Sequence, residues 1–410
     1  MERAVYLVGG AVRDELLGLE PAEKDWVVVG GTPEVLLAEG YRQVGASFPV
    51  FLHPETKEEF ALARTERKQG LGYHGFTVDF HPGVTLEEDL ARRDLTVNAM
   101  ARAPNGDLID PFGGAQDLEQ RLLRHVSPAF REDPLRVLRV ARFAARFAHL
   151  GFEVHESTLE LMSQMSASGE LGHLVPERVW AEVVSAMATQ SPGVFVEVLR
   201  QCGALADLLP EVDVLFGIPQ PERYHPEIDT GLHVVMAMNL AARIGGTPAV
   251  VFSLLLHDLG KGLTPKSEWP SHVGHEQQGI PLVRQVCERM KAPSAFLELA
   301  LRVAGLHLRC HRLCESRPGT VMKLLEDANL LRRPDLLPEF SLACEADYRG
   351  RKGCEDRPYP QADLLKKALD AALQVQARDL DTEGLDGKQV GELLREARIR
   401  AIAGAAGPAD

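Results

Sequence analysis

The sequence predicts an α+β protein in which a small α/β unit precedes a remainder built from helices. Two observations lead to this fold class. Over roughly the first hundred residues, short strand-like apolar runs alternate with turns and short helical patterns. From about residue 150 onward, apolar residues recur at helical spacing instead. A chain of 410 residues is long enough for several domains of this kind.

The first predicted elements are a strand, a glycine turn and a short helix. Tyr6 to Val8 form a β-prone apolar run, and Gly9-Gly10 ends it. Backbone without side chains can approach a phosphate closely at such a turn. Helical spacing begins at Ala11, and Gly18 ends the helix. The stretch therefore predicts a nucleotide site.

Two carboxylates lie just before the next predicted strand, Trp26–Val29, whose unbroken apolar run predicts burial on both faces. Glu23 and Asp25 are separated by one residue, so on an extended chain both point to the same side. Such a pair suits two divalent cations about 3.5–4 Å apart, the spacing of two-metal phosphoryl transfer. A solvated charged turn explains most isolated motifs of this type, but the upstream glycine turn favours the metal site.

Two more strands, Val50–Leu52 and Glu59–Ala63, complete the predicted α/β unit. Glu59 is either a third carboxylate of the site or an exposed strand residue. The following segment, residues 64–75, combines basic residues with glycines and predicts a mobile, positively charged loop.

The sequence from residue 85 to 114 predicts a helix, a charged turn and a closing strand. Thr85 and Glu88 form a capping-box pattern at the helix start. Arg92-Arg93-Asp94 follows, and adjacent arginines beside a triphosphate would act as charge clamps, although most such pairs are surface residues. Leu108–Ile109 then reads as a strand ending in a turn.

A stripe of arginines follows this unit. Asp133 is a natural helix N-cap, and Pro134 suits the first helical position. The next arginines are spaced to share one helix face: Arg136, Arg139, Arg142 and Arg146. Like charges on one face repel one another, and a bound anion would remove that penalty. The alternative is a solvated basic face.

A second group of chemically active residues lies in the helical remainder, after a proline-rich boundary near residues 219–226. His233 lies on a predicted helix, His257-Asp258 follows the apolar run 249–256, and Asp347 comes much later. Imidazoles and carboxylates brought together from separate helices would form a mixed site for a divalent first-row metal. A lone helical histidine is more often a satisfied core residue. His275 and His307 are possible additional members.

Composition limits the partners. The formal net charge of -14 argues against a basic coat, so a nucleic acid would need a local basic patch. No apolar run approaches the ~20 residues of a membrane span, and the first strand leaves no room for a secretory signal. The six cysteines do not form a disulfide framework. We expect a cytoplasmic protein.

Together these motifs resemble the class II tRNA nucleotidyltransferases of the polymerase-β superfamily. The resemblance rests on Leu7–Asp14, the carboxylate pair, Arg92-Arg93-Asp94 and Glu132–Arg136. With the His257-Asp258 module, the chain resembles the bacterial multifunctional CCA-adding proteins. The implied fold is a nucleotidyltransferase head with a polymerase-β-like mixed sheet, an all-α neck and body, and an all-α HD domain. The expected domains are residues 1–125, 126–222, 223–350 and a helical tail, 351–410.

The resemblance implies addition of C, C and A to tRNA 3′ ends from CTP and ATP without a nucleic-acid template. Glu23 and Asp25 match the Mg²⁺ ligands, and the loop at residues 64–75 matches an element linked to the switch from C to A. Asp133 and Arg136 match the pair that contacts the base edge. The other matched nucleotide-binding residues are Gly10, Arg13, Arg93, Arg139 and Arg142.

The HD-domain resemblance implies a metal-dependent phosphohydrolase with 2′,3′-cyclic phosphodiesterase, 2′-nucleotidase and phosphatase activities. Its matched residues are His233, His257, Asp258 and Asp347, with Ni²⁺ or another divalent metal. The expected partners are tRNA, CTP and ATP, with no DNA and no membrane, and the protein is expected to be a monomer or homodimer.

One residue departs from the family pattern, because aspartate usually occupies both metal positions and Glu23 stands at the first. The extra methylene moves the oxygens by about 1–1.5 Å, and Mg²⁺ demands near-ideal geometry. Two alternatives stay open: a bacterial poly(A) polymerase, which shares the head, and a nucleotide- or tRNA-binding regulator with weakened catalysis.

Overall fold

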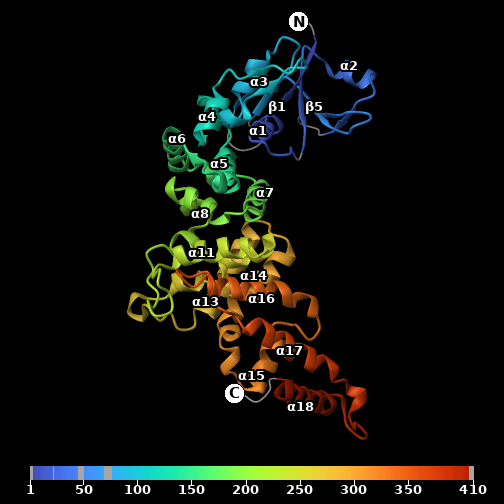
Figure 1. The fold of residues 1–410 in the computed structure, drawn as a ribbon, viewed down its shortest axis with the longest axis vertical. Helices are drawn as coiled ribbons and strands as arrows, with labels where there is room; N and C mark the ends of the chain where they lie inside the picture. The colour runs from blue at the N-terminus through green and yellow to red at the C-terminus, as the bar shows by residue number, and fades with distance from the viewer. Residues whose placement is uncertain (1–2, 22, 45–49, 69–75, 406–410) are drawn as a thin grey trace. The chain divides into compact units, whose positions relative to one another are not determined.

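A computed structural model describes residues 3–21, 23–44, 50–68 and 76–405. The chain forms two compact units: Met1–Glu182 with Val194–Leu208, and Val183–Gly193 with Leu209–Asp410. Every strand that the described residues form lies in the first unit, among the blue to green elements of Figure 1. The second unit is helical over its described length. The predicted α+β class is therefore confirmed.

The first unit contains a seven-stranded sheet with the order β3-β4-β5-β2-β1-β8-β9. The strand β2 pairs antiparallel with β1 and parallel with β5, so the sheet is mixed, as expected. Its strands are β1 (Ala4–Val8), β2 (Asp25–Val29), β3 (Arg42–Val44), β4 (Val50–Leu52), β5 (Glu59–Leu62), β8 (Ala101–Arg102) and β9 (Leu108–Ile109). The pattern did not predict β3 and β8, because Arg42-Gln43-Val44 and Ala101-Arg102 lack the apolar run that marks β4 and β9.

The central strand β2 is buried on both faces, as its apolar run predicts. Val27 and Val29 pack in one core cluster with Val8, whereas Val28 packs in a second cluster with Phe51 and Phe60. Alternate residues of a strand point to opposite faces, so one short run serves both layers. Burial of this strand fixes the position of Asp25, its first residue.

Two small sheets accompany the large one: β6 (Thr65–Lys68) with β7 (Phe76–Asp79), antiparallel, and β10 (Leu122–Leu123) with β11 (Glu153–Val154), parallel. The prediction of a loop over residues 64–75 is wrong for residues 65–68, which form β6. These residues gain backbone hydrogen bonds from a strand that begins only after the glycines, a pairing that charge and glycine content do not indicate. Residues 69–75 lie outside the described residues.

The helices that begin before residue 209 include α1 at the glycine turn and α5, which carries the arginine stripe. They are α1 (Gly10–Leu16), α2 (Pro33–Ala38), α3 (Leu86–Ala91), α4 (Gly114–Gln120), α5 (Leu135–Phe147), α6 (Glu156–Ala167), α7 (Pro176–Met187), α8 (Pro192–Gln201) and α9 (Ala204–Leu208). The capping box at Thr85 and Glu88 is present at the start of α3, as predicted.

The predicted start of α5 is corrected by one residue. Pro134, rather than Asp133, occupies the N-cap, and Asp133 ends the preceding 3₁₀ helix with extended dihedral angles. The proline ring disfavours the helical conformation for the residue before it, which explains the shift. Asp133 still caps the helix locally, because its Oδ1 accepts from the Leu135 N–H at 3.0 Å.

The second unit supplies the histidines and carboxylates of the other predicted site. Its helices are α10 (Pro210–Asp213), α11 (Thr230–Arg243), α12 (Pro248–Leu256), α13 (His275–Arg289), α14 (Ser294–His311), α15 (Pro318–Asp327), α16 (Leu337–Arg349), α17 (Gln361–Gln374) and α18 (Gly387–Ala405). Residues 250–256 of α12 are all buried. Among the described helices, none is both long and apolar enough to cross a membrane.

Candidate active sites

A cavity of about 720 Å³ opens in the first unit. Every residue predicted for the nucleotide site lines it: Gly10, Arg13, Glu23, Asp25, Arg93, Asp133, Arg136, Arg139 and Arg142. The structure adds Asn98 and Arg178, which the motifs did not single out, together with Arg64 of the predicted basic loop and Arg146 of the arginine stripe. The cavity thus combines a carboxylate wall with several guanidinium groups, the composition expected of a site for a metal-bound polyphosphate.

The carboxylate wall lies at the start of β2. Asp25 is exposed to solvent, and it lines the cavity. Partial burial of its carboxylate and the charge of Glu23 raise its pKa, whereas the charge of Arg93 lowers it. Asp25 pairs in register with Glu59 on β5, so a third carboxylate adjoins the first two, as one interpretation of the sequence suggested. Mutual repulsion among these groups makes the wall suitable for divalent cations.

The glycine turn holds one arginine of the site against the strand end. Gly9 has φ of 71°, and a Cβ at this residue would lie 2.6 Å from Arg93 Nη1. A side chain would therefore clash with Arg93 and strain the backbone. Arg93 is also held by the buried Asp89 at 3.3 Å, so glycine and carboxylate together fix the guanidinium.

Arg13 is more deeply engaged than a phosphate-binding arginine needs to be. Its side chain is 3% exposed, donates to Asp14 at 2.8 Å and Asn98 at 2.5 Å, and lies over the rings of Phe143 and Phe147. Burial is the main cause that lowers its pKa. Arg13 therefore joins α1 to α5 while it lines the cavity.

The arginine stripe on α5 is balanced by carboxylates. Arg139 pairs with Asp94 at 2.8 Å, Arg142 donates to Glu182 at 2.5 Å, and Arg146 pairs with Asp14 at 3.0 Å. From the sequence, an anion or solvent was expected to offset the repulsion among these arginines. The ion pairs with carboxylates also offset it, and they fix the direction in which each guanidinium points.

The pair predicted to contact the base edge is held rigidly. Asp133 binds Arg178 of α7 at 2.8 Å through the oxygen that does not cap α5. Arg136 is buried and donates to the backbone carbonyls of Ala129 and Arg92. These two bonds to backbone carbonyls fix the position of the Arg136 guanidinium.

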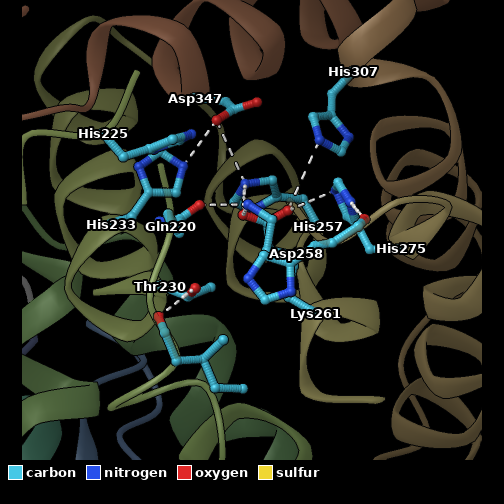
Figure 2. Close-up of polar contacts among 12 residues, drawn as sticks. Gln220, His225, Thr230, His233, His257, Asp258, Lys261, His275, His307 and Asp347 are labelled. Atoms are coloured by element: carbon cyan, nitrogen blue, oxygen red, sulfur yellow. Dashed lines mark hydrogen bonds and ion pairs between the residues drawn. The ribbon is translucent and has the colours of Figure 1, made fainter. Parts of the chain in front are cut away.

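The second predicted site forms from separate elements of the second unit (Figure 2). The structure brings together all the predicted residues: His233 of α11, His257 and Asp258 after α12, His275 of α13, His307 of α14 and Asp347 of α16. Each is at most 4% exposed. His233 lies 2.9 Å and His257 3.5 Å from Asp347, and His275 lies 3.2 Å from Asp258.

Backbone carbonyls orient three of these imidazoles. The Nδ1 atoms of His257, His275 and His307 lie 2.7, 2.8 and 3.0 Å from the carbonyls of Leu254, His272 and Val303. Since a carbonyl only accepts, Nδ1 donates in each ring, and Nε2 is the nitrogen that faces the other residues of the centre. Such second-layer bonds are typical of histidines that bind metals.

Unsatisfied buried atoms show that a divalent cation fits this centre. His257 Nε2, Asp258 Oδ1 and His275 Nε2 are buried and have no hydrogen-bond partner among the described residues. The ligand atoms fall into two groups that could each hold an ion, His233-His257-Asp347 and Asp258-His275-His307. Burial opposes protonation of His257, but the two carboxylates outweigh burial and raise its pKa to about 10. A cation would replace that proton as the compensating charge.

Several residues around the centre were missed by the sequence interpretation. His311 binds the second oxygen of Asp347 at 2.7 Å, and Glu227 lies 3.3 Å from His233 Nδ1. Lys261 donates to Asp258 at 2.6 Å. A signal existed for His311, which is four residues after His307 on one helix face. None existed for Glu227, because a long-range contact leaves no local pattern.

Comparison with known proteins identifies the family. A family model described as "Poly A polymerase head domain" matches residues 5–124. A model described as "Probable RNA and SrmB- binding site of polymerase A" matches residues 151–216, and an HD domain model matches residues 230–349. The multifunctional CCA protein of Thioalkalivibrio sulfidiphilus is 60% identical over 397 residues, 97% of either chain. That of Alkalilimnicola ehrlichii is 59% identical, with 97% of both chains covered.

The chain belongs to the multifunctional CCA protein family. Among solved structures, a CTP complex of the Bacillus stearothermophilus CCA-adding enzyme is similar, with a TM-score of 0.66 at 23% identity over 98% of this chain and 89% of that one. A tRNA complex of the Thermotoga maritima enzyme has a TM-score of 0.59 at 20% identity over 100% and 88%. These likenesses support the fold. The nucleotidyltransferase and HD domains of the family imply dependence on divalent metal.

Proposed function

We propose that this chain completes tRNA 3′ ends by adding C, C and A from CTP and ATP without a nucleic-acid template. The observation that carries the proposal is the cavity that joins Glu23 and Asp25, at the start of β2, to the arginines of α5. One site of this kind can hold a metal-bound triphosphate and leave side chains free to select its base. Family membership gives the direction, since the relatives with 60% and 59% identity are CCA proteins.

In the head, Glu23 and Asp25 hold Mg²⁺, which when bound supplies Lewis-acid activation of the attacking tRNA hydroxyl and charge neutralisation at the triphosphate. Arg93, Arg139 and Arg142 contact the triphosphate, and their carboxylate partners keep them pointed into the cavity. Prepositioned charges of this kind need no reorganisation during the reaction. Gly10 leaves room for the nucleotide at the turn, and Arg13 supports that turn through its contacts with α5.

Base selection belongs to Asp133 and Arg136. One carboxylate and one guanidinium together offer both acceptor and donor groups, as the edges of cytosine and adenine require. Their bonds to Arg178 and to backbone carbonyls hold the pair in place, so that protein side chains replace a template.

In the second unit, we assign a phosphohydrolase with 2′,3′-cyclic phosphodiesterase, 2′-nucleotidase and phosphatase activities. Ni²⁺ or another divalent ion, held by His233, His257, Asp258 and Asp347 with His275 and His307 nearby, supplies an activated water and charge stabilisation when bound. The chain's own residues orient that site through Nδ1 bonds to carbonyls. The activity would remove damaged phosphate ends before the head extends the tRNA.

One assay tests the head assignment. Purified protein receives a tRNA that lacks its 3′ CCA, with CTP and ATP singly and together, and the products are sequenced at their 3′ ends. We expect addition to stop after CCA when both nucleotides are present. Long A tails would support a poly(A) polymerase, and nucleotide binding without addition would support a catalytically weakened regulator.

Four further expectations remain predictions: the domain boundaries at residues 125, 222 and 350, a cytoplasmic location, a monomer or homodimer, and tRNA rather than DNA as the nucleic acid. Size-exclusion chromatography with light scattering tests the oligomeric state. Limited proteolysis followed by mass spectrometry tests the boundaries, because cleavage concentrates in exposed linkers.

A further inference from the structure

A buried amide lies beside the HD centre without a role in it. Gln220 is 2% exposed and belongs to the segment between the RNA-binding and HD matches. Its Oε1 accepts from Lys261 Nζ at 2.5 Å, and the same ammonium donates to Asp258 Oδ2 at 2.6 Å. Figure 2 shows Gln220 among the residues of the centre. The three side chains form a chain of hydrogen bonds that ends on a predicted metal ligand.

The amide nitrogen of Gln220 is unsatisfied. Nε2 is buried and has no hydrogen-bond partner among the described residues. Exchanging the amide oxygen and nitrogen would not help, because Nε2 would then face the ammonium of Lys261, and two donors cannot bond each other. A buried donor that lacks an acceptor costs free energy, so the site favours a ligand that brings one.

Hydrogen bonds to the backbone of Pro219 and Gln220 fix the position of this segment beside the HD centre. The N–H of Gln220 donates to the Ile228 carbonyl at 2.6 Å. The carbonyl of Pro219 accepts from His272 Nε2 at 2.8 Å, and His272 Nδ1 lies 2.5 Å from the Thr264 hydroxyl. A donor held this firmly is preorganised for a ligand of defined shape.

The charges near Gln220 favour an anion with several acceptor atoms. The ammonium of Lys261 has three N–H groups, of which two are used by Gln220 and Asp258. Its third N–H and the two of Gln220 Nε2 remain as donors beside a centre otherwise rich in acceptors, with Asp258 and Asp347 both buried. An anionic substrate of that centre needs such donors, because the carboxylates alone would repel it.

We propose that Gln220 and Lys261 form the phosphate-binding subsite of the HD centre, for the non-bridging oxygens of a phosphomonoester or a 2′,3′-cyclic phosphate. The inference rests on the proposed phosphohydrolase and adds the residues that orient its substrate. Gln220 donates through Nε2, and its Oε1 holds Lys261 so that the remaining N–H of the ammonium points to the same ligand.

The test uses the full-length protein loaded with divalent metal and follows binding of inorganic phosphate by isothermal titration calorimetry. Two variants separate the roles of the amide. Gln220→Glu keeps an acceptor for Lys261 but replaces the donor, whereas Gln220→Met removes both. We expect phosphate affinity to fall about tenfold or more in each, the worth of a hydrogen bond to a charged group. Metal affinity and CCA addition should stay unchanged, and Gln374→Glu, on the exposed end of α17, is the matched control.

Three results would overturn the subsite. Wild-type affinity for phosphate in Gln220→Glu, with a loss only in Gln220→Met, would show that Gln220 merely holds Lys261. Equal loss of metal affinity in both variants would make Gln220 a support of the metal. Absence of phosphate binding by the wild-type protein would remove the ligand itself. By contrast, phosphate binding that depends on Gln220 without hydrolysis of any phosphate ester would sustain the subsite and refute the proposed phosphohydrolase.

Discussion

Replacement of Asp94 by asparagine tests how the cavity arginines are held. Asp94 is 6% exposed, and its Oδ2 accepts from Arg139 Nε and Nη2, both at 2.8 Å. Its Oδ1 accepts from the Leu95 N–H and from Asn98 Nδ2. Asparagine retains Oδ1 and its two bonds but turns a donor toward the guanidinium. The substitution therefore removes one charge and the two bonds to Arg139 while it leaves the fold of the turn intact.

The expected cost follows from those lost contacts. A hydrogen bond to a charged group contributes about 1.5–3 kcal/mol, and two are lost. Compensation is partial, because the Arg139 side chain is 37% exposed to water and has Glu182 at 3.7 Å. We expect an apparent destabilisation of about 2–3 kcal/mol, or a fall in Tm of about 5–10 °C for a unit of this size. CTP incorporation should fall about tenfold as Arg139 loses its direction.

The pH dependence gives a second, independent readout. Burial opposes ionisation of Asp94, but Arg139 and Asn98 outweigh burial and hold its pKa well below the ordinary value of about 3.9. A depressed pKa contributes stability that is present above the unfolded pKa and lost as pH falls. The difference between wild type and variant should thus be constant above about pH 5 and shrink below about pH 4.

Differential scanning calorimetry across this pH range measures both effects. Asp207→Asn, an exposed substitution on α9 of the same unit, is the control and should change Tm little. A decrease in Tm of less than about 2 °C would refute the view that Asp94 anchors Arg139. So would a difference in Tm between wild type and variant that does not shrink in acid.

Three other predictions concern the two sites. Asp25→Ala should lower incorporation at least about a thousandfold, whereas Glu23→Asp should keep or raise it, as single-turnover assays with CTP will show; undiminished activity of Asp25→Ala contradicts the metal site. Gly9→Ala should destabilise the protein by about 1–3 kcal/mol through its φ of 71°, which thermal unfolding measures; wild-type Tm contradicts the strain. His311→Leu should lower the metal affinity of the HD centre about 10–100-fold, because Asp347 loses the imidazole that holds it, and CCA addition should stay unchanged. Titration with Ni²⁺ measures the affinity, and an unchanged value would contradict the positioning role of His311.

Local sequence patterns were sufficient for much of the fold. The glycine turn, the buried run of β2 and the capping box at Thr85 each depend on neighbours in sequence, so they were predicted correctly. The strand β6 was missed because its partner lies beyond a glycine-rich segment. The start of α5 was shifted because the proline acts on the residue before it, an effect that outweighs the capping preference of Asp133.

The two sites show the same contrast between local features, which the sequence predicts, and long-range contacts, which it does not. The motif residues could be predicted because each carries chemistry that the sequence displays directly, and the structure brings them together. Residues that hold them, such as Glu182 for Arg142 and Glu227 for His233, come from distant segments and have no local signature. Only the three-dimensional structure reveals that carboxylates neutralise the arginine stripe of α5, and that unsatisfied imidazole and carboxylate atoms converge in the second unit.

The central claim is that one chain carries two separable metal-dependent sites acting on the same RNA end. The most direct measurement gives the protein a tRNA that lacks CCA and ends in a 2′,3′-cyclic phosphate, with CTP and ATP, and sequences the 3′ ends. The wild type should yield CCA ends, His257→Ala should leave the cyclic phosphate unextended, and Asp25→Ala should yield a hydroxyl end without addition. If His257→Ala still produced CCA ends, or if Asp25→Ala left the phosphate in place, the two sites would not divide the chemistry in this way.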